Sequence, residues 1–147
     1  MSAINSPNRW AEKVEEACLS KGLQLTPLRR RVLSILSESG DPLGAYAIID
    51  RLSKLEGKPI APPTVYRTLE FFEDNGFLHK IESRNVFVPC EHPGHAHAGV
   101  LLLCDVCGQA QEREDDDLAG AVGRAAERAG FTMVPQMLEL HGLCQSC

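Results

Sequence analysis

Four of the six cysteines in this 147-residue chain form two Cys-x-x-Cys pairs, Cys104 with Cys107 and Cys144 with Cys147. Such a pair places two thiolates on one side of a tight turn, and four thiolates match the tetrahedral coordination of Zn²⁺. The 36 residues between the pairs exceed the spacing of a simple zinc ribbon, so we expect a whole element, a helix, to be inserted there. A redox role is the alternative, but the pattern lacks a thioredoxin-like βαβ setting. The sequence therefore predicts a structural zinc with no open coordination position.

A second set of possible metal ligands is scattered through the middle of the chain. Cys90 stands beside three histidines, and packing alone explains a thiol in that setting poorly. The other candidates are His79, His92, His95, His97 and Glu112. Taken singly, an exposed histidine or glutamate is more often solvated than ligating. Together, one thiolate with imidazoles and a carboxylate favours Zn²⁺ over harder ions, in a site that would join the two halves of the chain.

The charge distribution separates these halves. Residues 1–85 carry 12 basic and 11 acidic side chains, whereas residues 86–147 carry 3 basic and 9 acidic ones, for a net charge of −5. This balance argues against nucleic-acid binding by the whole surface but allows it for the N-terminal half. The hydrophobic fraction of 44% excludes a disordered chain.

Several classes of protein are not expected. No apolar run approaches the roughly 20 residues that span a bilayer, and the N-terminus shows no signal peptide, so we expect a cytoplasmic protein with no membrane partner. In that compartment, paired cysteines favour metal over disulfides. The enzyme motifs G-x-S-x-G, the P-loop and H-E-x-x-H are missing from the sequence, so we predict neither an enzyme nor a small-molecule substrate.

Hydrophobic periodicity and turn residues predict an α+β protein with two domains. Four helices begin near Pro7, Pro27, Gly44 and Pro62, and a hairpin of strands 77–81 and 86–88 follows. The C-terminal half reads as strands 100–103 and 109–112, a helix capped near Asp115, and a strand over 131–140 in which Pro135 marks an edge or bulge. The expected organisation is a winged helix-turn-helix DNA-binding domain (1–84), a hinge with metal ligands (85–98) and an αβ dimerisation domain (99–147).

The predicted helix 62–75 takes the place of a recognition helix. It would present Thr64, Tyr66 and Arg67 to the major groove. Arginine can bind guanine or phosphate, and tyrosine can contact phosphate or a thymine methyl. The run Arg29 to Arg31 is either a second basic contact or a solvated helix face, and Tyr46 is either core or a phosphate contact.

Three segments and the two cysteine pairs resemble the ferric uptake regulator (Fur) family over nearly the whole chain. They are residues 25–33 (Leu-Thr-Pro-Leu-Arg-Arg-Arg-Val-Leu), 63–69 (Pro-Thr-Val-Tyr-Arg-Thr-Leu), 75–77 (Asn-Gly-Phe) and the two cysteine pairs. Ala45-Tyr46, residues 79–83, Cys90 and residues 141–144 look most like the zinc uptake regulator (Zur) branch.

The resemblance implies a homodimeric, zinc-responsive repressor that binds palindromic double-stranded operator DNA of zinc-uptake genes, with two zincs per chain. The structural zinc then falls on the four paired cysteines, and the regulatory zinc falls on His79, Cys90, His97 and Glu112. His97 is chosen because it stands seven residues before Cys104, where the branch places its ligand. Tyr46, Tyr66 and Arg67 match positions that face DNA, and His141 is expected to be packed or hydrogen-bonded and not a ligand.

Three alternatives remain open at this point. A Fur-family protein of the same fold could sense iron or manganese, although Cys90 argues against a harder metal. A zinc hydrolase would need an open coordination position and a general base that the sequence does not show. A purely structural zinc-ribbon module would hold one zinc per chain and bind no DNA.

Overall fold

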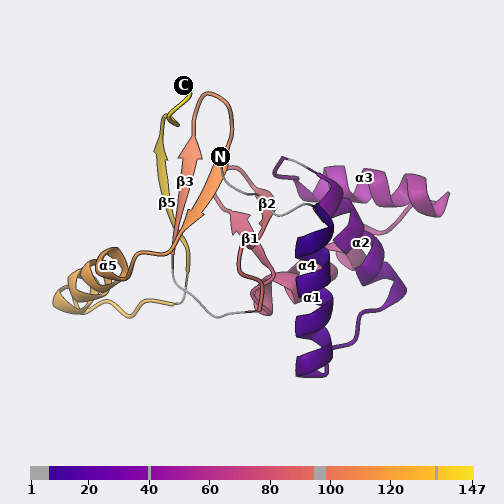
Figure 1. Ribbon diagram of the computed structural model, residues 1–147, viewed down its shortest axis with the longest axis horizontal. Helices are drawn as coiled ribbons and strands as arrows, with labels where there is room; N and C mark the ends of the chain where they lie inside the picture. Colours follow the sequence, from indigo (N-terminus) through magenta and orange to yellow (C-terminus); the bar gives the residue numbers. More distant parts are fainter. Residues whose placement is uncertain (1–6, 40, 95–98, 135) are drawn as a thin grey trace. The chain divides into compact units, whose positions relative to one another are not determined.

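The computed structural model describes residues 7–39, 41–94, 99–134 and 136–147 (Figure 1). The chain divides into two compact units, residues 1–95 and 96–147. The division lies inside the stretch predicted as the hinge. Among the described helices, none is long and apolar enough to cross a bilayer.

Four helices and a hairpin make up the N-terminal unit. The helices are α1 (Pro7–Lys21), α2 (Pro27–Glu38), α3 (Ala45–Glu56) and α4 (Pro62–Asp74). Their boundaries follow from local chemistry. Thr26 caps α2 by accepting the N–H of Arg29 at 3.2 Å, and proline occupies the first helical position of both α2 and α4. Gly57 ends α3 in the left-handed conformation, at φ +69°.

One apolar core joins these helices. Each helix contributes a stripe at helical spacing, such as Val65, Leu69 and Phe72 on α4, and these three side chains are at most 1% exposed. The largest fully buried members of the core come from all parts of the unit: Val14, Val32, Leu36, Ile48, Leu52, Val65, Leu69, Phe72, Phe77 and Leu78.

The hairpin consists of β1 (Leu78–Ile81) and β2 (Val86–Pro89), paired antiparallel with His79 opposite Val88. Its turn is closed by Asn85, which adopts a positive φ of 51° that asparagine tolerates. Phe87 also pairs with Leu43, between α2 and α3, through two backbone hydrogen bonds of 2.7 and 3.0 Å. Helices with an attached wing of this kind confirm the predicted α+β class and the winged-helix arrangement.

The C-terminal unit is a three-stranded sheet with the order β4-β3-β5. Its elements are β3 (Val100–Cys104), β4 (Ala110–Arg113), α5 (Asp116–Arg128) and β5 (Leu138–Gly142). The central strand β3 is antiparallel to β4 and parallel to β5. A parallel neighbour requires a crossover connection, and α5 supplies it, as the long spacing between the cysteine pairs predicts.

One predicted boundary is wrong. The strand expected over residues 131–140 begins only at Leu138, and residues 131–134 and 136–137 are irregular. The Phe131 N–H instead completes the end of α5 by donating to Ala126 O at 2.9 Å. The physical reason is the register: Leu138 pairs with Val100, the first residue of β3, so earlier residues have no partner strand. Pro135 lies outside the described residues.

Helix α5 begins at Asp115, whose side chain accepts the N–H of Leu118 at 2.9 Å. The helix is amphipathic, yet none of its residues is buried. It lies off the end of the sheet where β4 finishes and β5 begins, and it does not cover a sheet face (Figure 1). The apolar residues on one face of this helix, which include Leu118 and Val122, are therefore only half-buried within this unit.

Candidate metal centres

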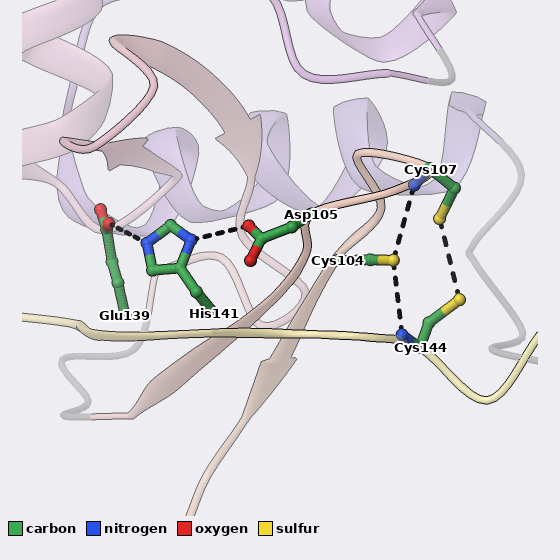
Figure 2. A network of polar contacts seen from close by, with 6 residues as sticks. All are labelled: Cys104, Asp105, Cys107, Glu139, His141 and Cys144. Atoms are coloured by element: carbon green, nitrogen blue, oxygen red, sulfur yellow. Dashed lines mark hydrogen bonds and ion pairs between the residues drawn. The ribbon is translucent and has the colours of Figure 1, made fainter. Parts of the chain in front are cut away.

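The parallel pairing of β3 and β5 brings the two cysteine pairs to the same end of the sheet. Cys104 ends β3 and lies opposite Gly142, the last residue of β5. The four Sγ atoms lie within 4.8 Å of one another, and those of Cys107 and Cys144 are 3.8 Å apart (Figure 2). Two Zn–S bonds of about 2.3 Å at a tetrahedral angle span nearly the same distance. The structure thus brings together all four cysteines predicted to hold the structural zinc.

Backbone amides stabilise the thiolate form of Cys104, which is the form that binds a metal cation. Its Sγ accepts the N–H of Cys107 at 3.5 Å and the N–H of Cys144 at 3.4 Å. These two amides, with that of Val106, lower the pKa of the Cys104 thiol to about 6, so it is a thiolate at neutral pH. The turn that aims them depends on Gly108, which has a φ of +77°.

The pKa values of the Cys107 and Cys147 thiols are raised, so these two hold their protons more tightly. Hydrogen bonding with the Cys144 side chain and burial raise the pKa of Cys147 to about 12. A divalent cation drives such thiols to thiolates and offsets the repulsion among them. The donor set therefore fits Zn²⁺, and with four thiolates it would be a closed structural site.

A polar network beside these cysteines connects the turn that carries Cys104 and Cys107 to the end of the chain that carries Cys144 and Cys147. His141 Nδ1 lies 3.0 Å from Asp105 Oδ1, and His141 Nε2 lies 3.8 Å from Glu139 Oε2 (Figure 2). The Asp105 N–H also donates to Gly142 O at 2.8 Å. The contacts agree with the prediction that His141 is hydrogen-bonded. Asp105 is not among the residues predicted from the sequence. The one feature of the sequence that could have indicated its role is its position directly after Cys104.

The N-terminal unit holds two of the predicted regulatory ligands. His79 lies on β1, and Cys90 directly follows β2, so the hairpin pairing sets them near each other. A ring nitrogen of His79 and the Cys90 Sγ are within 4.8 Å. The Cys90 side chain is fully buried, and its N–H donates to Phe77 O at 3.0 Å. The structure therefore brings the Cys90 thiol of the predicted hinge together with the His79 imidazole of β1.

The other predicted ligands belong to the second half of the chain. Glu112 lies on β4 opposite Leu101 and is 7% exposed, so its carboxylate is buried. His97, and the competing His95, lie outside the described residues. His92 is exposed.

The predicted DNA-contacting side chains lie on the outer faces of α3 and α4. Burial of Val65, Leu69 and Phe72 turns the opposite face of α4 outward, so Tyr66 is 38% exposed, Arg67 is exposed and Thr64 is half-buried. Tyr46, at the start of α3, is 74% exposed and is therefore not part of the core.

The arginine run has structural partners. The Arg29 guanidinium lies 3.7 Å from the centre of the Phe71 ring and donates to Gln24 O at 2.6 Å. Arg30 pairs with Glu15 at 3.1 Å, and Arg31 pairs with Glu56. Each of these three arginines therefore has a partner within the N-terminal unit.

Comparison with known proteins matches this architecture to one family. The model of the ferric uptake regulator family matches residues 20–141. The chain belongs to the ferric uptake regulator family. A zinc uptake regulation protein from Escherichia coli (strain K12) is 35% identical over 138 residues, covering 92% of this chain and 79% of that protein.

Two solved structures extend the similarity to nearly the full length. Holo XcZur is 43% identical, with a TM-score of 0.85 over 95% of this chain and 97% of that one. A zinc uptake regulator complexed with zinc and DNA is 32% identical, with a TM-score of 0.87 over 97% of this chain and 95% of that one. These findings confirm the resemblance stated from sequence. This Fur-family chain is a regulator of transcription, not an enzyme.

Proposed function

We propose that this Fur-family protein is a zinc-responsive repressor of zinc-uptake genes, acting as a homodimer on palindromic operator DNA in the cytoplasm. The observation that carries the proposal is the pairing of His79 with the buried Cys90 in the DNA-binding unit, because a thiolate with an imidazole suits Zn²⁺. The similarity to zinc uptake regulators, including one complexed with zinc and DNA, supports the same metal and the same partner.

Two zincs per chain have separate roles in this proposal. The four paired cysteines hold a structural ion at the end of the C-terminal sheet. The regulatory ion is held by His79, Cys90, His97 and Glu112, which come from the winged-helix unit, the hinge and β4. One ion bound by all four restrains the two units relative to each other.

That restraint supplies the regulation. If only the restrained arrangement presents both recognition helices of a dimer to successive major grooves, zinc raises the affinity for operator DNA. The coupling is reciprocal, so DNA also tightens zinc binding. Tyr46, Thr64, Tyr66 and Arg67 make the contacts with DNA, and the acidic C-terminal unit stays away from phosphate.

Iron or manganese is the second candidate for the regulatory metal. Both prefer oxygen and nitrogen donors more strongly than zinc does, and the buried Cys90 thiol disfavours them. Titration of one protein sample with each metal, with DNA affinity as the readout, separates the candidates.

The test compares Cys90→Ser with Cys18→Ser. Cys18 is the matched control because it is also a buried cysteine of the N-terminal unit. It is 2% exposed and packs from α1 into the apolar core of that unit. The probe is a duplex selected by the wild-type protein from a random pool in the presence of zinc. We expect Cys90→Ser to keep one zinc per chain and its fold, and to need at least about a hundredfold more free zinc for DNA binding. An unchanged zinc response in Cys90→Ser would contradict the proposal.

A further inference from the structure

The carbonyl oxygen of Phe77 connects α1 to the candidate regulatory ligands. It accepts two hydrogen bonds, one from Trp10 Nε1 at 3.2 Å and one from the Cys90 N–H at 3.0 Å. A carbonyl has two lone pairs, so both donors can be satisfied at once. Phe77 lies two residues before His79, at the start of β1. One fully buried peptide group therefore lies between a helix side chain and the positions of both ligands.

The other end of α1 contacts the chain just after Cys90. Lys21 Nζ donates to Gly94 O at 3.0 Å and lies 5.8 Å from the centre of the Phe77 ring. Gly94 has a φ of +88°, and a Cβ there would meet the Cβ of Ala17 at 3.1 Å. Glycine thus allows the segment to run close against α1, while its N–H donates to Gly76 O at 3.3 Å.

We infer that Trp10 and Lys21 are positioning residues for the metal-binding Cys90 thiolate. This inference rests on the proposed regulatory zinc site. Trp10 acts through the Phe77 carbonyl on the backbone of Cys90, and Lys21 holds Gly94, where the described part of the hinge ends. Neither residue is a metal ligand.

The physical basis is the one known for supporting shells of metal sites. A ligand that is already fixed loses little freedom when the ion binds, so partners that fix it raise metal affinity. Because Cys90 is fully buried, its side chain has little rotamer freedom, and the position of its Sγ atom depends on where the backbone is held. Two hydrogen bonds from α1 hold the backbone before and after Cys90. Trp10 Nε1 donates to Phe77 O at 3.2 Å, and Lys21 Nζ donates to Gly94 O at 3.0 Å.

The test uses the full-length protein with its four-cysteine zinc in place and Co²⁺ as the probe of the second site. Cobalt bound to a thiolate gives a charge-transfer absorption band, which reports the Cys90–metal bond directly. Trp10→Phe keeps an aromatic ring in the core but removes the N–H donor. Val14→Ala is the matched control, because Val14 is fully buried on the same helix and its side chain has no hydrogen-bond donor. Lys21→Met is compared with Lys13→Met in the same way.

We expect Trp10→Phe and Lys21→Met each to weaken Co²⁺ binding at the thiolate site by about tenfold and to alter the band. Val14→Ala and Lys13→Met should leave both unchanged, and all variants should keep the structural zinc. Equal shifts in Trp10→Phe and Val14→Ala would overturn the inference by assigning the effect to stability. Unchanged affinity in Trp10→Phe and Lys21→Met would overturn it while leaving the regulatory site intact. Absence of the band in the wild-type protein would overturn the proposed site itself.

Discussion

The imidazole of His141 and the carboxylate of Asp105 lie 3.0 Å apart, although they are 36 positions apart in the chain. Asp105 belongs to the turn between Cys104 and Cys107, and His141 lies on β5, three residues before Cys144. Their contact joins the loops that carry the two cysteine pairs. The four-cysteine site is therefore held by side chains as well as by strand pairing.

Removal of this contact should loosen the structural zinc. We expect His141→Ala to release zinc to a competing chelator at about tenfold lower chelator concentration than the wild type, because the two loops lose a tether. Glu139→Gln is the graded control, since its 3.8 Å contact with His141 is longer and should matter less. Equal zinc retention in His141→Ala and the wild type would show that strand pairing alone holds the loops.

Zinc binding at the same site should weaken as the pH falls. Only thiolates bind the ion, so every thiol that is protonated in the metal-free protein must release a proton. The pKa of Cys147, raised to about 12, makes it contribute a proton throughout the physiological range. The pKa of Cys104, lowered to about 6, makes it contribute only below that pH. Affinity should therefore fall by at least about tenfold per pH unit, and more steeply below pH 6.

Chelator competition between pH 5 and 8 measures this dependence, and calorimetry in buffers of different ionisation enthalpy counts the protons released. A pH-independent affinity, or binding without proton release, would show that the cysteines are not ligands in the manner described.

Arg67 should contribute to DNA binding without contributing to metal binding. It is exposed on α4 beside the buried stripe, with no role in the core. Arg67→Ala should weaken binding to the selected duplex by about tenfold or more, since one arginine contact with a base or phosphate is worth about 1–3 kcal/mol. Arg128→Ala, which removes an exposed arginine from α5, should have little effect. Equal losses in both variants would indicate a general charge effect and not a recognition helix.

The apolar stripe of α5 should lie in the dimer interface. Leu118 and Val122 lie on this stripe, and neither is buried within the chain. Val122→Asp should dissociate the dimer at micromolar concentration, because a buried unpaired carboxylate costs several kcal/mol. Arg124→Asp places the same side chain on the opposite face of α5 and should leave the dimer intact. Sedimentation equilibrium distinguishes the two, and a stable Val122→Asp dimer would place the interface elsewhere.

Much of the fold could be predicted because its signals are local. Thr26 followed by Pro27 marks the start of α2, Asp115 marks the start of α5, and each cap forms the hydrogen bond expected of it. The cysteine pairs were equally clear, since their chemistry depends on spacing within a turn. Such signals are complete within a few residues and need no knowledge of the rest of the chain.

The features that escaped prediction depend on distant partners. The start of β5 at Leu138 is set by the first residue of β3, and no property of residues 131–137 reveals it. Trp10 reads as an ordinary core residue in the sequence, and its hydrogen bond to Phe77, 67 positions away, exists only in the folded unit. The sequence leaves the role of the run Arg29 to Arg31 open, because partners such as Phe71 are brought close only by helix packing.

The central claim is that one chain holds a permanent structural zinc and an exchangeable regulatory zinc that controls DNA binding. Zinc content per chain before and after mild chelation, with duplex affinity measured on the same samples, tests it most directly. We predict two zincs falling to one, with DNA affinity lost after chelation and restored when zinc is returned. One zinc that never changes, with no second ion taken up on titration, would leave only the four-cysteine site and contradict the account.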